Sequence, residues 1–152
     1  MFNRLSIALS HFAARLPVGP AAYLWLFGFW LVTLCFLSAS SPPLESRQEI
    51  PHLDKVLHFG YFFLGGAIFA AHCGLRWPET SRRRLLLLVV LVCSVIGRLD
   101  EYHQGFVPGR SGNDTGDWLA DTVGGFSGAL FVIWFLLPIM LDGKDGKRVE
   151  SS

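Results

Sequence analysis

The sequence predicts an all-α membrane protein: a four-transmembrane-helix bundle preceded by an N-terminal amphipathic interfacial helix. Of the 152 residues, 51% are hydrophobic and only 16% are charged, and the net charge is +1. The apolar residues form unbroken runs, whereas the strands of a soluble domain or a β-barrel would alternate them with polar residues. Because lipid cannot satisfy backbone hydrogen bonds, such runs cross a bilayer as helices.

Four runs are expected to span the membrane, which takes about 20 residues of helix. The first run is uncharged, and the second holds two histidines but no formal charge. The third has only 13 apolar residues, 85–97, so it must extend to residue 104 to cross. The fourth carries a single acid near its start. The predicted spans are residues 20–38, 56–75, 85–104 and 118–141, within a transmembrane domain of residues 20–141.

Both terminal segments are predicted to lie outside the bilayer. Residues 142–152 form a charged tail. In residues 1–19, apolar side chains recur at spacings of three and four, which is typical of an amphipathic helix lying on the membrane surface. These side chains are Phe2, Leu5, Leu9, Phe12 and Leu16.

The basic residues predict the orientation of the spans. Nine lysines and arginines lie in the N-terminal segment, the loop between the second and third spans, and the tail, against four on the other side. Loops rich in lysine and arginine stay in the cytoplasm. Both termini are therefore expected to be cytoplasmic, with the first loop (39–55) and the third loop (105–117) facing outwards.

Polar residues gather at the predicted outer ends of three spans. A charged residue at depth costs at least about 2.5 kcal/mol on insertion scales. A chain with 13 basic and 12 acidic residues that concentrates so many of them on one side indicates a functional site there. The three groups are Asp54, Lys55 and His58; Asp100, Glu101 and Gln104; and Arg110, Asp114, Asp117 and Asp121.

The spacing of these residues suggests which of them face the bundle. In the fourth span, Asp117, Asp121, Gly124 and Gly128 fall at spacings of four, three and four, which places them on one helix face. Small residues let helices approach closely, so this seam should face the bundle and carry its acids inward. We also expect His58, Glu101, Arg110 and Asp117 to share one cluster.

A structural interpretation exists for each polar residue taken alone. Acids and bases at helix ends can solvate the interface or pair to hold helices together. Lys55 and Arg98 fit this interpretation best, because long basic side chains reach the interface readily. The cluster of arginines at residues 82–84 is explained by topology, so nucleic-acid binding is unsupported.

These polar residues also carry a family resemblance. The pieces are Asp54-Lys55-x-x-His58-Phe59, then Asp100-Glu101-x-x-Gln104-x-Phe106-x-Pro108-x-Arg110, then Asp117-x-x-x-Asp121-x-x-Gly124. In this order they resemble the VanZ-like family of bacterial membrane proteins. The chain departs from the family pattern at Asp121, where asparagine is usual, and at Phe62, where a tyrosine is usual.

The resemblance implies a multi-pass protein of the bacterial inner membrane with a role in the cell envelope, because the family is named after a protein associated with teicoplanin resistance. It implies no known reaction. Our first hypothesis is an outward-facing polar pocket that binds an envelope lipid or amphiphile and affects lipoglycopeptide (teicoplanin-type) susceptibility. Arg110 would engage a phosphate or carboxylate. Further binding residues would be Asp54, Lys55, Asp100, Gln104 and Asp121.

Two other functions stay open. One is a membrane-embedded acid/base or metal-assisted hydrolase or transferase, with His58, Glu101 and Asp117 as acid/base groups or cation ligands. The absence of an HExxH motif, and of a nucleophile motif beside a histidine, weakens it. The other is a proton-coupled carrier, although the polar residues crowd one end of the spans rather than their middle. The cofactor, any metal, the oligomeric state and the ligand stay undefined by the sequence.

Overall fold

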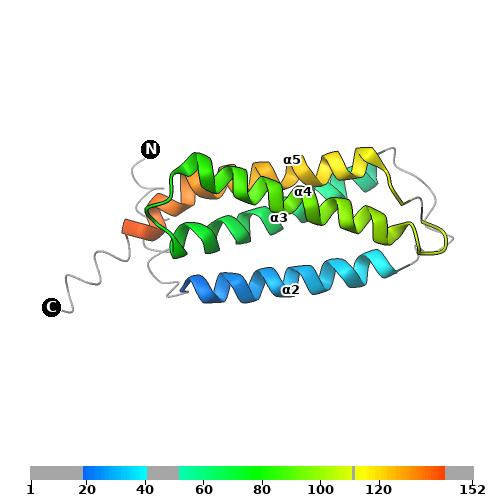
Figure 1. Cartoon of the computed structure of the whole chain (residues 1–152), viewed down its shortest axis with the longest axis horizontal. Coiled ribbons are helices and arrows are strands. Elements are labelled where there is room, and N and C mark those ends of the chain that lie inside the picture. Colours follow the sequence, from blue (N-terminus) through cyan, green and yellow to red (C-terminus); the bar gives the residue numbers. More distant parts are fainter. Residues whose placement is uncertain (1–18, 41–51, 111, 143–152) are drawn as a thin grey trace.

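The structure is a computed structural model that describes residues 19–40, 52–110 and 112–142. The predicted amphipathic helix over residues 1–19 and the charged tail fall, except for residues 19 and 142, outside the described residues. The elements are α2 (Pro20–Ala39), α3 (Leu53–Arg76), α4 (Arg82–Gln104), α5 (Thr115–Phe131) and the π-helix η2 (Val132–Leu136), all of them helical. The four long helices lie side by side, each reversing the direction of the one before (Figure 1).

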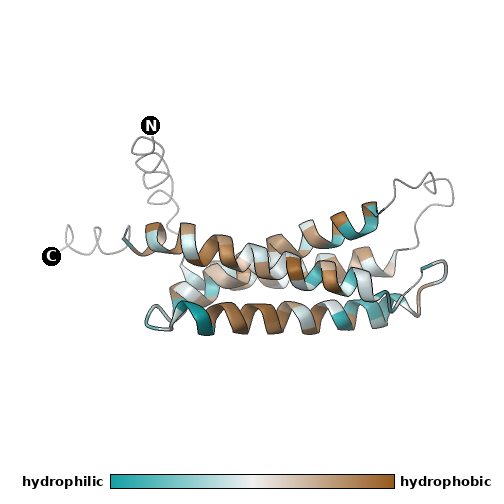
Figure 2. Ribbon diagram, turned by 90° about the horizontal axis from the view of Figure 1, so that it is seen from above, coloured by the Kyte–Doolittle hydropathy of each residue, from teal (hydrophilic) through white to brown (hydrophobic). Residues whose placement is uncertain are grey.

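Three helices are long and apolar enough to cross a membrane: Pro20–Ala39, Leu53–Arg76 and Thr115–Asp142. Helix α4 is not one of them. It has 23 residues, but arginines begin it, and Arg98, Asp100 and Glu101 interrupt its last turns. Figure 2 shows the hydrophobic residues along the middle of the bundle and hydrophilic ones toward the ends of the helices. The length and composition of these three helices indicate a membrane protein.

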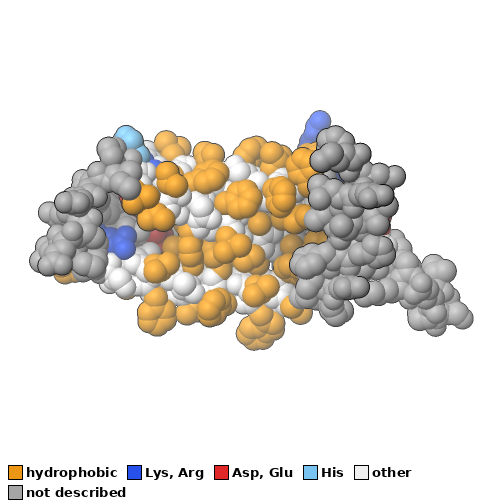
Figure 3. All heavy atoms as spheres, turned by 180° about the vertical axis from the view of Figure 1, so that it is seen from behind, with side chains coloured by type: hydrophobic (Ala, Val, Ile, Leu, Met, Phe, Trp, Pro, Cys, Tyr) orange, Lys and Arg blue, Asp and Glu red, His pale blue; other side chains and the backbone are white. Residues whose placement is uncertain are grey.

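The outer surface of the bundle suits a lipid environment. Large apolar side chains such as Trp25, Phe29 and Leu91 are exposed on α2 and α4. On the face drawn in Figure 3, hydrophobic side chains cover the middle of the molecule, while lysine, arginine and histidine side chains appear near its ends. A soluble monomer rarely exposes so much contiguous apolar surface.

Helices α3 and α5 pack closely because glycines line their contact. Gly124 faces the backbone of Phe59, and Gly128 faces the carbonyl oxygen of Phe63, so neither position has room for a Cβ atom. Asp117, Asp121, Gly124 and Gly128 are all buried. The prediction that this seam faces the bundle is confirmed, and the close approach draws both acids into the interior.

Trp30 makes several of the contacts that attach helix α2 to α3. The Trp30 indole Nε1 donates to the carbonyl oxygen of Tyr61 at 3.0 Å, and the Tyr61 hydroxyl donates to the carbonyl oxygen of Trp30 at 2.8 Å. The Trp30 ring stacks on Phe27 and Tyr61 and lies directly against Gly65. This contact sets the position of α2, whose far end contributes to the site described next.

Candidate functional site

The alternating helix directions bring four helix ends together at one end of the bundle. These are the end of α2, the start of α3, the end of α4 and the start of α5 (Figure 1). All the predicted site residues lie there. We call them the polar cluster: Asp54, Lys55, His58, Asp100, Glu101, Gln104, Arg110, Asp114, Asp117 and Asp121.

Lys55 holds three of the acids. Its Nζ atom lies 3.1 Å from a carboxylate oxygen of each of Asp54, Asp114 and Asp117. Asp114 also caps α5, because its Oδ1 accepts a hydrogen bond from Gly116 N at 2.6 Å. This hydrogen bond and the nearby Lys55 ammonium keep the pKa of the Asp114 carboxyl below its ordinary value of 3.8. Lys55 therefore joins the start of α3 to the start of α5.

His58 pairs with Asp121 one helical turn deeper. The His58 Nδ1 and Asp121 Oδ1 atoms lie 2.9 Å apart, an ion pair whenever the imidazole is protonated. Asp121 reaches this position beside α4 because Gly97 has no side chain. A Cβ atom there would stand 2.7 Å from Asp121 Oδ2. That second oxygen is buried and accepts no hydrogen bond in the structure.

Glu101 is 1% exposed and connects α4 to α5. Its Oε2 accepts a hydrogen bond from Asp114 N at 2.7 Å, and its carbonyl oxygen accepts one from Asn113 N at 3.1 Å. Its other carboxylate oxygen, Oε1, is buried and has no hydrogen-bond partner. Over the described ranges, neither Arg98 nor Arg110 forms an ion pair with Glu101. Glu101 therefore connects the helices through backbone N–H groups and not through an ion pair with either arginine.

A second chain of hydrogen bonds runs through Asp100. Its two oxygens accept from the hydroxyl of Ser38 and from Gln104 Nε2, the latter at 2.8 Å. Gln104 Oε1 in turn accepts from Arg110 Nη1 at 3.1 Å. Sequence reasoning missed Ser38, because a serine at the end of an apolar run gives no signal of a partner 62 residues away.

Arg110 closes the end of α2. Its Nη2 donates to the carbonyl oxygen of Leu37 at 2.9 Å and its Nε to that of Ser40 at 3.2 Å. The last carbonyl groups of a helix lack partners within the helix, and a cation beside them is favourable. All three guanidinium nitrogens of Arg110 thus bind protein oxygens. The geometry weighs against the expected contact between Arg110 and a ligand phosphate.

The predicted residues accordingly fall into three connected groups. The first group is His58, Asp100 and Glu101. One nitrogen or carboxylate oxygen atom from each of these residues lies within 4.8 Å of those from the other two. Asp117 belongs to the Lys55 group, and Arg110 lies at the edge, joined through Gln104. Trp118 borders the cluster and donates from Nε1 to the carbonyl oxygen of Ser94 at 3.0 Å.

Comparison with known families gives a match over most of the chain. The family model described as VanZ/LLP1 matches residues 9–137. The chain belongs to the VanZ/LLP1 family. No curated protein and no solved structure matches it. The resemblance inferred from the motifs is therefore confirmed, and the match includes every residue of the polar cluster.

The two departures of this VanZ/LLP1 chain from the family pattern have different consequences. Asp121, where asparagine is usual, places a carboxylate against His58 and adds an acid to the interior. Phe62, where tyrosine is usual, is fully buried and meets the Trp30 ring edge-on. The hydroxyl of the neighbouring Tyr61 is used in the contact with α2, so neither residue brings a phenol to the polar cluster.

Proposed function

We propose that this VanZ/LLP1 protein crosses the bacterial inner membrane four times, with both termini in the cytoplasm and the polar cluster at the outer face. The nine-to-four distribution of basic residues supports this orientation. Helix α4, with 23 residues, is about 34 Å long, and the hydrocarbon core is about 30 Å thick. Its exposed middle is apolar, while Asp100 and Glu101 face the bundle. These features support α4 as the remaining span.

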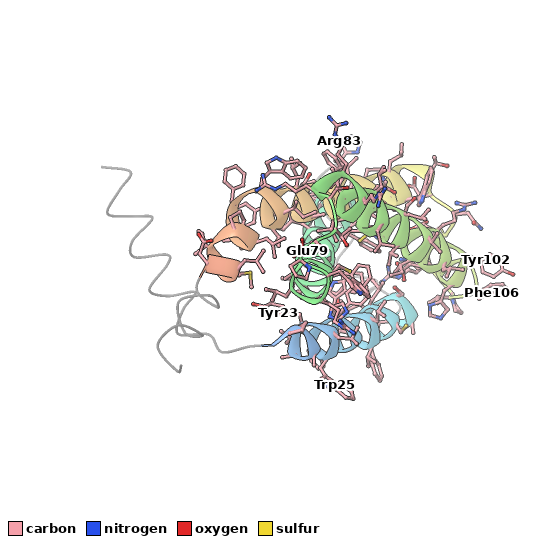
Figure 4. All side chains as sticks on the ribbon, turned by 60° about the vertical axis from the view of Figure 1, so that its left-hand side comes forward. Tyr23, Trp25, Glu79, Arg83, Tyr102 and Phe106 are labelled. Carbon is pink, nitrogen blue, oxygen red and sulfur yellow. The ribbon has the colours of Figure 1, made fainter. Side chains whose placement is uncertain are left out.

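Cysteine labelling tests this orientation. Glu79 and Tyr102 mark opposite ends of the bundle (Figure 4), and the exposed His103 follows Tyr102. With Cys35, the exposed native cysteine, replaced by serine, we expect a membrane-impermeant maleimide to label His103→Cys in intact cells. Glu79→Cys should react only after the membrane is opened. The reverse pattern would place the polar cluster on the cytoplasmic side and contradict the proposal.

We further propose that the polar cluster binds the headgroup of an envelope lipid or amphiphile and so affects lipoglycopeptide susceptibility. The observation that supports it most is the pair of buried carboxylates, Glu101 and Asp121, each with one oxygen that has no hydrogen-bond partner. Exposed apolar side chains stand beside them at the same end of the bundle: Leu57, Leu99, Tyr102 and Phe106. A ligand with a polar head and an apolar tail fits this combination.

The charges in the cluster indicate the chemistry of that headgroup. Six acids stand against two basic residues, and both Lys55 and Arg110 already bind protein oxygens. A lone phosphate would meet net negative charge, whereas an amine or a hydroxyl group could donate to the carboxylate oxygens that lack a hydrogen-bond partner. No serine or cysteine side chain hydrogen-bonds to His58 among the described residues, so the geometry adds no support for the hydrolase or transferase alternative.

Glu101→Gln is the variant that tests the proposed function. Glutamine keeps an oxygen that can accept from Asp114 N but removes the negative charge. In a strain lacking the chromosomal gene, we expect Glu101→Gln protein to accumulate in membranes like the wild type. It should nevertheless leave teicoplanin susceptibility at the level of the deletion strain.

The matched control is Glu79→Gln, the same chemical change at the exposed opposite end of the bundle (Figure 4). It should restore wild-type susceptibility. Membrane abundance by immunoblotting and the midpoint of thermal unfolding in detergent show whether each variant is folded. A folded Glu101→Gln protein with full wild-type effect on susceptibility would contradict the proposal.

A further inference from the structure

Three side chains of the polar cluster offer a mixed nitrogen and oxygen ligand set. One ligand atom each from His58, Asp100 and Glu101 lies within 4.8 Å of the other two. Two ligand atoms on a tetrahedral zinc ion are about 3.4 Å apart. Binding zinc would therefore shorten each distance between two ligand atoms by at most about 1.4 Å. Rotation of side-chain torsions can supply this change.

The unpartnered oxygens are an independent sign of a missing partner. Glu101 is 1% exposed, and its Oε1 has no hydrogen-bond donor nearby. Asp121 is 0% exposed and leaves Oδ2 without one. A buried acceptor without a partner costs about 1–3 kcal/mol, and more when it is charged. A bound proton would turn Glu101 Oε1 into a donor that needs an acceptor of its own, whereas a cation binds the lone pair directly.

The surrounding contacts hold the three ligands as a metal site requires. His58 directs Nδ1 at Asp121, which leaves Nε2 for coordination, and metal-binding histidines commonly bond a carboxylate in this way. Ser38 and Gln104 hold Asp100, and Asp114 N holds Glu101 Oε2. Each of the three side chains is therefore held by hydrogen bonds that leave it a ring nitrogen or an oxygen lone pair for a cation.

The charge balance points the same way. Asp100, Glu101 and Asp121 are three buried acids, and His58 is the one group among them that can carry a positive charge. Lys55 is committed to three other acids, and Arg110 to Gln104 and the end of α2. Buried charges are normally paired or coordinate metals.

We infer that His58, Asp100 and Glu101 bind a divalent first-row transition-metal ion. An imidazole nitrogen with two carboxylates suits zinc or manganese, whereas calcium and magnesium prefer oxygen ligands alone. The ion would connect α3 to α4 and neutralise the acids that the helices bury. This inference does not depend on headgroup binding, because it concerns the purified protein and the metal alone.

The test is titration of purified, chelator-stripped protein in detergent, without a histidine tag, with ZnCl₂ and separately with CaCl₂. We expect calorimetry to show one zinc ion per chain, and the midpoint of thermal unfolding to rise on binding. Calcium should have at least tenfold lower affinity. His58→Gln and Glu101→Gln should each weaken zinc binding by about 100-fold or more, since even residues that only orient ligands contribute 10–100-fold. Glu79→Gln should bind like the wild type.

X-ray absorption of the zinc-loaded wild-type protein keeps the test independent of how well the variants fold. It should show one imidazole and oxygen ligands, without sulfur. Absence of zinc binding at millimolar concentration would overturn the inference. Unchanged affinity in a folded Glu101→Gln protein, or sulfur in the zinc coordination shell, would overturn it equally.

Discussion

Replacing Trp30 by alanine is expected to loosen α2 from the rest of the bundle. The indole is 3% exposed, bonds to Tyr61 and packs against Phe27 and Gly65. Truncating a buried tryptophan costs about 3–5 kcal/mol in soluble cores, through lost packing and the cavity left behind. Packing contacts also hold membrane helices together. We therefore expect a large fall in the midpoint of thermal unfolding in detergent.

The matched control for this substitution lies on the same helix. Trp25 is 81% exposed and points away from the bundle (Figure 4). Trp25→Ala removes the same side chain from the surface of α2 and should leave the unfolding midpoint nearly unchanged. Equal effects of the two substitutions would show that Trp30 does not attach α2 to α3.

The positions of the helices could be predicted because lipid-facing helices need long apolar runs. The four runs correspond to α2, α3, α4 and the helical segment Thr115–Asp142. The boundaries differ by a few residues: α4 begins at Arg82 and α5 at Thr115, three residues before each predicted span. An apolar run marks the part of a helix that suits lipid, while backbone hydrogen bonding continues through the polar residues on either side.

The gathering of the polar residues at one end could be predicted from helix direction, but their individual partners could not. The Glu101 carboxylate, for example, is bound by a backbone N–H group, that of Asp114, and not by a basic side chain. Backbone donors leave no trace in the pattern of charged residues. Arg110 is similar, since two of its partners are the carbonyl oxygens of Leu37 and Ser40, at the end of α2.

The specific partners of Lys55 could not be predicted from the sequence. Its long side chain suggested a structural residue reaching the interface. In the structure it is structural in a different way, because its ammonium lies at 3.1 Å from each of three carboxylates. Two of these, Asp114 and Asp117, belong to another helix end some 60 residues later, and only the packing of α3 on α5 brings them to Lys55.

Lys55→Met is expected to have the second large effect on stability. The methionine keeps much of the apolar stem but leaves Asp54, Asp114 and Asp117 without their shared cation. An exposed pair contributes about 0.2–1 kcal/mol, whereas removing one partner of a buried pair costs about 3–5 kcal/mol. The Lys55 side chain is 32% exposed and that of Asp117 only 9%, so we expect a cost between these limits. Thermal unfolding at neutral pH measures it, with Arg83→Met at the exposed opposite end as the control (Figure 4).

The pH dependence of this effect follows from Asp114. The hydrogen bond from Gly116 and the Lys55 ammonium keep the pKa of Asp114 below its ordinary value of 3.8. A depressed carboxyl pKa stabilises the folded state above the unfolded pKa, and the stabilisation is lost as the pH falls through the folded value. The difference in unfolding midpoint between wild type and Lys55→Met should thus be full at neutral pH and shrink below about pH 4.

Calcium offers a second check on the role of Lys55. In the structure, one oxygen from each of the three acids lies within 4.8 Å of the others, and Lys55→Met removes the ammonium that they share. Millimolar CaCl₂ should restore part of the stability of Lys55→Met while leaving the wild type unchanged, since calcium binds clustered carboxylates. A Lys55→Met protein as stable as the wild type at neutral pH would mean that solvent already neutralises the three acids.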